Sequence, residues 1–230
     1  MKGFLADSAY WAIVVSLASY VLGDMLKRKL RLVVMNPILV SVVLTVVFLH
    51  LSGTDYSQYK QSSSFLSWLL TPATVCLAIP LYEQLSILKK NKLAVSVGIA
   101  SGVATSFLCI LALALLFKLD HAGYVTLLPK SITTAIGMEL SGQNGGFAPI
   151  TAILIVLTGI AGNVASPFVL RVFGITDPVA RGVAIGVSSH AIGTAKALEM
   201  GEIEGAASSL AIVVAGILTV LEFLLVGNII

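Results

Sequence analysis

The sequence predicts an all-α protein: a polytopic membrane helical bundle with about seven to eight transmembrane segments. Its 230 residues are 57% hydrophobic, and the mean hydropathy is +1.01. Charged residues make up 11% of the chain, against roughly 25% in soluble domains, which is too few to cover a water-facing surface. Because each crossing takes about 20 residues, the length leaves no room for a large catalytic domain outside the membrane.

Apolar runs separated by polar breaks give the predicted helices of the first half. The runs are Tyr10–Met25, Leu32–Leu51, Phe65–Tyr82 and Leu93–Phe117. Residues 1–26 form an additional N-terminal helix, and no small-residue cleavage site marks it as a removed signal. A polar loop at 52–64 follows the second run, and Pro72 and Pro80 interrupt the third.

The second half begins with a short segment, 127–140, and continues with apolar runs at 150–173, 179–198 and 206–226. The short segment is either a re-entrant or half-length helix, which leaves about seven crossings, or a full crossing, which gives about eight. We favour the re-entrant form because it puts Arg171 and Arg181 on the cytoplasmic side, together with the basic loops at 27–31 and 89–92. The last run contains one acid, Glu222.

Breaks in two of these runs suggest an inverted repeat within a single domain, 1–230. The proposed repeats cover about 32–117 and about 149–229, and they would enter the membrane from opposite sides. The middle run of each repeat is broken, at 71–80 and at 188–194. Two discontinuous crossing helices at corresponding positions are typical of an inverted-repeat transporter with a site near the midplane.

The same breaks predict a polar site. In hydrocarbon a helix is interrupted where protein or a water-filled cavity supplies hydrogen-bond partners, and free helix N-termini suit an anion such as a carboxylate. The polar side chains at the breaks are neutral or basic: Thr71, Thr74, Ser188, Ser189, His190, Thr194 and Lys196, with Gly193 beside them. The alternative is that the hydroxyl groups bond to their own helix backbone.

His190 has three alternative roles: binding the carboxylate, carrying a coupled proton, or making a hydrogen bond between helices. Since His50 and His121 lie at the ends of runs, no metal site or cofactor is expected.

Lys130 is a second candidate for anion binding, at the start of the short segment. Ser131, Thr133 and Thr134 would line the helix N-terminus beside it. The alternative is an interfacial lysine that reaches to lipid headgroups. Glu139 lies too far along the segment for an i,i+4 pair with Lys130, so it needs another partner.

Several function classes are disfavoured. The net charge is +3, with basic residues at loop ends and not in a stripe, so nucleic-acid binding is not expected. Cys76 and Cys109 lack metal-ligand spacing and are expected to pack as small residues without forming a disulfide. Ser189 and His190 are sequence neighbours, which does not make an activated nucleophile, so we expect no enzyme.

Two patterns have structural interpretations. The glycine pairs at 98/102 and 182/186 allow helices to approach closely, either within the bundle or across a homodimer. The acidic stretch 198–205 is expected to be a solvated turn, beside an ion pair of Lys196 with Glu199.

Four stretches carry a resemblance to a known family: NPILV (36–40), TPATVCLAIPLYEQL (71–85), LPKSITTAIGMELSGQNGGFAPITAILIVLTGIAG (128–162) and DPVARGVAIGVSSHAIGTAKALEMGEIEGAASSLAIVVAGILT (177–219). Through them the chain resembles the LrgB/CidB family along nearly its whole length. The resemblance implies a multi-pass protein of the bacterial inner membrane. It also draws attention to Pro129, Lys130, Ser131, Thr133, Thr134, His190, Gly193 and Thr194. Ala135 departs from the family pattern, in which a proline follows the two threonines.

The resemblance implies two functions. Family members are antiholin-like or holin-like regulators of murein hydrolase export and cell lysis, beside a smaller LrgA/CidA-type partner. A related chloroplast envelope protein exports glycolate and glycerate, and bacterial relatives are linked to pyruvate uptake.

Our leading hypothesis is therefore a carrier of small carboxylates that works by alternating access, with His190, Lys130 and the neighbouring hydroxyl groups binding the anion. The alternative is a lysis regulator that acts through the glycine-rich helix faces. A membrane-embedded enzyme is a distant third.

Overall fold

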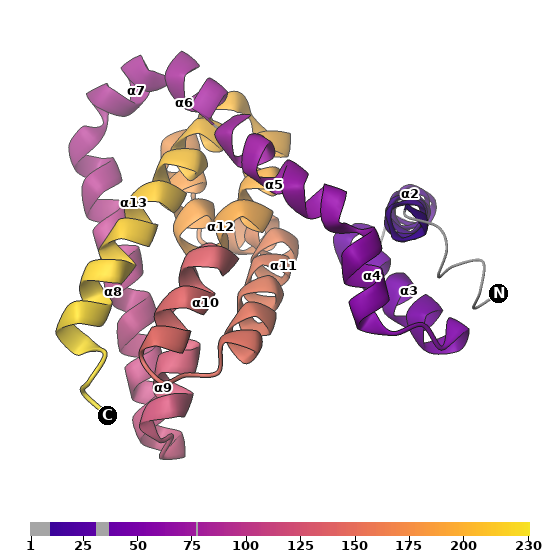
Figure 1. Ribbon diagram of the computed structural model, residues 1–230. Coiled ribbons are helices and arrows are strands. Elements are labelled where there is room, and N and C mark those ends of the chain that lie inside the picture. The colour runs from indigo at the N-terminus through magenta and orange to yellow at the C-terminus, as the bar shows by residue number, and fades with distance from the viewer. Residues whose placement is uncertain (1–9, 31–36, 77) are drawn as a thin grey trace. The chain divides into compact units, whose positions relative to one another are not determined.

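The computed structural model describes residues 10–30, 37–76 and 78–230 (Figure 1). The regular secondary structure of these residues is entirely helical, as predicted. Some side chains within the helices lie outside this description, namely those of Leu30, Leu70, Thr71, Ala73, Thr74, Pro80 and Leu81. The chain divides into two compact units, Met1–Cys76 and Leu77–Ile230.

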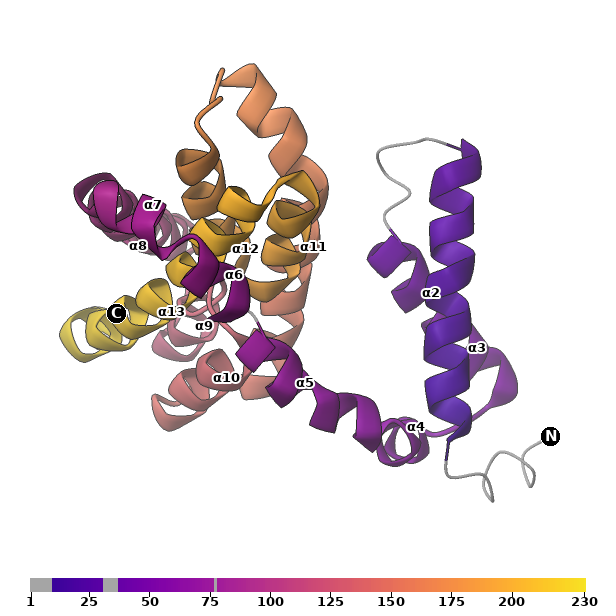
Figure 2. The same cartoon turned by 90° about the horizontal axis from the view of Figure 1, so that it is seen from above.

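The first unit contains α2 (Trp11–Leu30), α3 (Pro37–Ser52), α4 (Tyr56–Ser62) and α5 (Ser64–Cys76). α2 and α3 pack side by side (Figure 2). The buried Trp11 ring lies 6.2 Å from the Phe48 ring of α3 and 6.0 Å from the Tyr59 ring of α4. This aromatic contact joins α2, α3 and α4, three of the helices described in this unit, because large rings bury much apolar surface where they meet.

The polar stretch 52–64, predicted as a loop, contains helix α4. Asp55 caps this helix by accepting the backbone N–H of Ser57 at 2.8 Å. The Ser16 and Tyr59 hydroxyl groups lie 2.7 Å apart and tie α4 to α2. The loop prediction was wrong here because a good N-cap starts a helix even in a polar sequence.

The third apolar run is divided between the two units. α5 continues through Pro72 and ends at Cys76, and α6 (Ala78–Glu83) belongs to the second unit. The break predicted at Thr71–Pro72 is therefore absent from the described backbone, whereas the side chains of Thr71 and Thr74 lie outside the described residues. Since the predicted repeat at 32–117 extends over both units, its relation to 149–229 stays a prediction.

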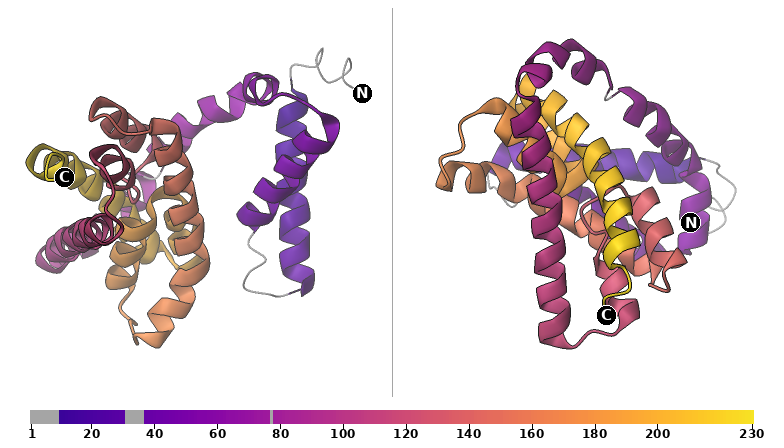
Figure 3. Two further views of the ribbon diagram at one scale, coloured as in Figure 1. Left: turned by 90° about the horizontal axis from the view of Figure 1, so that it is seen from below. Right: turned by 90° about the vertical axis from the view of Figure 1, so that its left-hand side faces the viewer.

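The second unit continues with α7 (Leu85–Lys90), α8 (Lys92–Phe117), α9 (His121–Leu127), α10 (Thr134–Gln143), α11 (Ala148–Val172), α12 (Pro178–Met200) and α13 (Glu202–Val226). Among the described residues, three helices are long and apolar enough to cross a membrane: α8, α11 and α13. α8 and α13 lie side by side (Figure 3), and α12 packs against both. Seven to eight crossings stay a prediction.

α9 and α10 form a helical hairpin. At its base, the His121 ring nitrogens lie 2.7 Å from the Ile230 carbonyl and 3.0 Å from the Asn144 carbonyl. Nearer the tip, a methyl group on Gly137 would lie 3.3 Å from the Pro129 carbonyl oxygen, so the two arms run antiparallel. α10 has 10 residues, or about 15 Å of rise, which is half of the roughly 30 Å hydrocarbon thickness. Of the segment predicted at 127–140, residues 128–133 form the connection between the two arms and 134–140 lie in α10, so the helix, but not the whole segment, has the length of a half-crossing.

α12 is a second hairpin, because its direction reverses at His190, where φ is 42° and ψ is −140°. The two arms pack together: a methyl group on Gly193 would lie 3.0 Å from Ile185 Cγ2. Both ends of α12 line one pocket, through Arg181 from its first arm and Met200 from its second. The break predicted in this run is confirmed, but the run is not a crossing helix that is merely interrupted: it turns back.

The two hairpins enter the second unit from opposite ends. α8 runs parallel to the first arm of α12, because methyl groups on Gly98 and Gly102 would lie 3.2 Å from Val183 Cγ1 and 2.6 Å from Val187 Cγ1. The base of α12 therefore lies at the Lys92 end of α8, whereas the base of α9–α10 follows the Phe117 end. Many basic residues gather at the first of these ends: Lys89, Lys90, Lys92, Arg171, Arg181 and Lys196. That this end is the cytoplasmic one stays a prediction of the charge rule.

Both glycine pairs serve contacts within the second unit. Gly98 and Gly102 receive the α12 valines described above, and a methyl group on Gly186 would lie 2.5 Å from the Ser208 carbonyl of α13. A methyl group on Gly182 would likewise clash with the Glu204 carbonyl. Of the two interpretations, close packing inside the bundle is the one that these contacts support.

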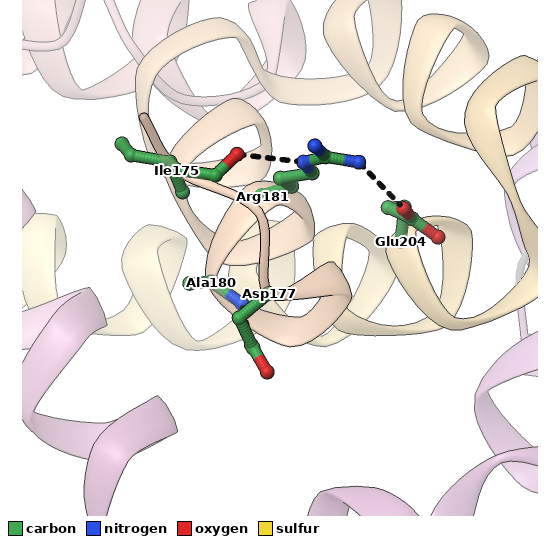
Figure 4. Close-up of polar contacts among 5 residues, drawn as sticks. All are labelled: Ile175, Asp177, Ala180, Arg181 and Glu204. Carbon is green, nitrogen blue, oxygen red and sulfur yellow. Dashed lines mark hydrogen bonds and ion pairs between the residues drawn. The ribbon is translucent and has the colours of Figure 1, made fainter. Parts of the chain in front are cut away.

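The acidic stretch 198–205 is not a solvated turn throughout. Glu204 lies in α13, is 7% exposed, and faces Arg181 of α12, with 3.8 Å between Arg181 Nη1 and Glu204 Oε1 (Figure 4). Arg181 Nε also donates to the Ile175 carbonyl at 2.8 Å, and Asp177 caps α12 by accepting the Ala180 N–H. The hairpin base is thereby fixed to the start of α13.

We expect Arg181→Ala to lower the free energy of unfolding by about 2 kcal/mol, because the buried Glu204 carboxylate loses its cation. Breaking the more exposed ion pair of Lys196 with Glu199, 2.7 Å long, should cost no more than about 0.5 kcal/mol. Thermal unfolding of purified Arg181→Ala and Lys196→Ala in detergent measures both costs. Equal losses in the two variants would contradict this assignment.

Candidate functional site

A hollow of about 460 Å³ lies in the second unit between α8, the tip of the α9–α10 hairpin and the first arm of α12. Its lining is polar at several positions and otherwise made of small or apolar side chains: Gly98, Ser101, Gly102, Thr105, Ser106, Cys109, Lys130, Ser131, Ala184, Val187 and Ser188. The hollow lies where the middle of α8 meets the tips of both hairpins.

Lys130 supplies the positive charge of the hollow. Its ammonium group donates to the Ser131 hydroxyl at 2.9 Å and to the Ser106 hydroxyl at 3.3 Å. Within the described part of the chain, Lys130 forms no ion pair with a carboxylate. Neutral hydroxyl groups solvate the charge but do not balance it, so the site is electrostatically prepared for an anion.

Helix α8 supplies hydroxyl groups that the sequence reasoning missed. Ser101, Thr105 and Ser106 all line the hollow. Two of them also bond to their own helix: Ser101 Oγ donates to the Gly98 carbonyl at 3.0 Å and Thr105 Oγ1 to the Ser101 carbonyl at 2.7 Å. The sequence does contain a pattern that predicts this polar face. Small and polar residues recur at intervals of three and four, which places them on one face of a helix, at 98, 101, 102, 105, 106 and 109.

Ser188 brings the first arm of α12 to the hollow. Its hydroxyl group donates to the Ile185 carbonyl at 3.3 Å and lies 3.0 Å from Ser189 Oγ. Ser189 itself is buried, and it occupies the space beside Gly162 of α11. The polar lining therefore ends two residues before the reversal of α12.

His190 lies at that reversal and faces α11. Its Nε2 atom lies 3.0 Å from the Ile155 carbonyl, and its ring fills the space beside Gly159. Asn163 of α11 donates to the Ile192 carbonyl at 2.8 Å. These contacts match the role of a hydrogen bond between helices and show how α11 accommodates the broken backbone.

Gly193 and Thr194 support the second arm of α12. Thr194 Oγ1 donates to the His190 carbonyl at 2.9 Å and lies 2.6 Å from the Ser208 hydroxyl of α13. Gly193 is buried beside Ile185, where a side chain would not fit. Of the predicted site residues, the structure thus brings Lys130 and Ser131 together with Ser188, whereas the described lining of the hollow does not include Ser189, His190, Gly193 or Thr194.

Thr133 and Thr134 begin α10, where Thr133 is the N-cap residue but its side chain makes no capping hydrogen bond. Neither belongs to the lining described for the hollow. Glu139 has a partner other than Lys130, as expected from the sequence: Gln143 Nε2 donates to its carboxylate at 2.6 Å. Both cysteines are free and exposed, so the expectation that they pack as small residues was wrong. Cys109 lines the hollow.

A model of the LrgB-like family matches residues 16–228 of the chain. The chain belongs to the LrgB family. It is also 37% identical over 215 residues to a protein of Bacillus subtilis (strain 168) named antiholin-like protein LrgB, with 93% of each chain covered. No solved structure matches the chain significantly. The family resemblance drawn from the sequence is therefore confirmed, and the LrgB family and the apolar helices together indicate a membrane protein.

Proposed function

We propose that this LrgB-family protein carries small carboxylates across the membrane, with Lys130 as the residue that binds the carboxylate. The observation that carries this proposal is the Lys130 ammonium group, which lies in a hollow with hydroxyl donors and without a described carboxylate partner. A cation held among apolar helices is costly unless an anion accompanies it. A hydrated solute that supplies this anion would remove the cost.

The hollow suits a small hydroxy- or keto-acid. Its volume of about 460 Å³ lies in the range of about 300–1,000 Å³ that is usual for ligand pockets. Lys130 would pair with the carboxylate, and the hydroxyl groups of Ser106 and Ser188 would hydrogen-bond to the second oxygen function of glycolate, glycerate or pyruvate. Gly98 and Gly102 line the hollow and let the α12 valines approach α8 closely, so a side chain at either position would push the two walls of the hollow apart.

The hairpins supply a means of alternating access. They enter from opposite ends, and their tips meet at the hollow, so each hairpin separates the hollow from one side. We infer an inverted relation between α8–α10 and α11–α12, in which a crossing helix is followed by a hairpin in both halves. This relation differs from the repeats expected at 32–117 and 149–229, which stay a prediction. A site between two such elements is the usual place for a substrate.

Uptake by proteoliposomes tests the carrier. Purified protein would be reconstituted, and the uptake of radiolabelled glycolate, glycerate and pyruvate would be compared with that of empty liposomes. We expect saturable uptake of at least one of these acids, and inhibition by the unlabelled acid. A folded, monodisperse protein that moves none of them, in either direction or under a pH gradient, would exclude this function.

A second candidate is an antiholin-like regulator of murein hydrolase activity and cell lysis, which works with a smaller LrgA/CidA-type partner in the bacterial inner membrane. The name of the B. subtilis relative supports this candidate more directly than it supports a carrier. Since the surfaces beside both glycine pairs are occupied by other helices of the second unit, a partner chain or a second copy would have to bind to other helix faces. Loss of lysis control on deletion, restored by a transport-dead Lys130→Met variant, would favour this candidate.

A further inference from the structure

We propose that Glu222 is the proton-binding group of the carrier, so that a proton and the carboxylate occupy the bundle together. This inference rests on the carrier function proposed above. It assigns a role to the acid within helix α13, a type of residue that is rare in apolar helices and usually functional there.

Glu222 lies next to the Lys130 site. Together with Thr219 it lines a small cavity of about 10 Å³, to which Ser106 and Ser131 also contribute. The same two serines accept hydrogen bonds from Lys130 and line the larger hollow. A cavity of about 10 Å³ holds roughly one water molecule, which could hydrogen-bond to both the carboxyl group and the serine hydroxyls.

Among the described lining residues of the two cavities, Lys130 is the one cationic side chain and Glu222 the one carboxylate. The other described residues of the small cavity are not titratable: Val103, Leu128, Ile132, Val187 and Ala215, with the hydroxyl residues named above. From α9, the Tyr124 phenol donates to the Val226 carbonyl of α13 at 3.1 Å, one turn after Glu222. From α8, Cys109 lies beside Lys130.

These charges link the proton to the substrate. In the empty carrier, the Glu222 carboxylate lies beside the two serines that accept from Lys130, but it forms no ion pair with the Lys130 ammonium group. When a substrate carboxylate binds Lys130, a second anion enters the same region of low dielectric, and protonation of Glu222 relieves the repulsion between the two carboxylates. Because linkage is reciprocal, protonation of Glu222 must also strengthen substrate binding. One proton would accompany each monocarboxylate.

His190 is less suited to this role. Its Nε2 atom is engaged by the Ile155 carbonyl, its ring is packed against Gly159, and it is absent from the described lining of both cavities. A proton on His190 would therefore not face the substrate. His190 thus stabilises the break in α12, whereas Glu222 is the residue that would carry the proton.

Proteoliposomes with wild-type protein, Glu222→Gln, Glu222→Asp and a control, Glu139→Gln, would test the inference. Two rates are compared: exchange of labelled for unlabelled pyruvate at equal pH, and accumulation driven by an inward proton gradient. Gln mimics the protonated carboxyl group, so we expect Glu222→Gln to keep exchange and to lose accumulation by about tenfold or more. Glu222→Asp should restore part of the accumulation, and Glu139→Gln, altered at an exposed carboxylate bonded to Gln143, should behave as wild type.

Each result has a defined meaning. Accumulation by Glu222→Gln equal to that of wild type, or wild-type exchange without any response to the pH gradient, overturns the proton role and leaves the carrier intact. Absence of both exchange and uptake in folded wild-type protein overturns the carrier, and this inference with it. Calorimetry on unaltered protein in two buffers of different ionisation enthalpy gives a measurement that needs no variant: uptake of about one proton per bound anion is expected, and none would refute the proposal.

Discussion

Lys130→Met is expected to weaken carboxylate binding by about 100-fold or more, because removal of one partner of a buried charge pair costs 2–5 kcal/mol and each 1.4 kcal/mol is about tenfold. Methionine keeps the length and apolar stem of lysine but supplies neither the charge nor the donors to Ser106 and Ser131. Lys130→Arg keeps the charge and should retain intermediate affinity, since its planar group cannot place its donors as the ammonium group does. Equilibrium binding of labelled pyruvate to purified protein measures these affinities.

Lys196→Met is the matched control for this prediction. Lys196 is also a lysine of the second unit, but it bonds to Glu199 and lines a different pocket. Its replacement should change pyruvate affinity by less than about twofold. If Lys130→Met binds pyruvate as tightly as wild type does, the hollow is not the binding site.

Gly186→Leu should prevent stable folding of the second unit. A methyl group at this position would already lie 2.5 Å from the Ser208 carbonyl and 2.8 Å from Ala211 Cβ, so a leucine side chain must separate α12 from α13. Overpacking of this kind costs about 3 kcal/mol or more, and a clash with backbone cannot be relieved by a rotamer change. We expect loss of the monodisperse peak in detergent and a large fall in the midpoint of thermal unfolding.

Gly142→Leu is the control for that substitution. Gly142 also lies in a helix of the second unit, but it is exposed, and a methyl group there would lie 3.7 Å from Ala148 Cβ, an ordinary contact. Its midpoint should stay close to that of wild type. A stable, well-folded Gly186→Leu protein would show that α12 and α13 are not packed as described. Loss of activity in Gly186→Leu does not by itself indicate a lost partner surface, because the same glycine is needed for the fold.

The sequence was sufficient to predict the helical class, most of the apolar helices and the break in α12. These depend on local properties: apolar length, polar interruptions, and the cluster of Ser, His and Gly at 188–194. Lys130 and Ser131 were also predictable as a polar pair beside a proline. The family resemblance pointed to the same residues.

The reversal at His190 was not predictable, because a polar break looks the same in a kinked crossing helix as in a hairpin. What decides between them is tertiary contact: Gly182 and Gly186 of one arm and Thr194 of the other all meet the same part of α13. The contribution of α8 was missed for another reason. Its hydroxyl groups are scattered along an otherwise apolar run, and they form a face only when the run is read at helical periodicity.

The turned-back path of α12 bears on how the protein is assembled as the ribosome makes it. A half-length hairpin whose tip carries Ser189 and His190 partitions poorly into lipid by itself, because the backbone groups at its interruption need hydrogen-bond partners. Those partners are the Ile155 carbonyl and Asn163 side chain of α11, synthesised earlier, and Ser208 of α13, synthesised later. We therefore expect the hairpin to reach its final position only after α13 has been synthesised, so that insertion of this region is cooperative and late.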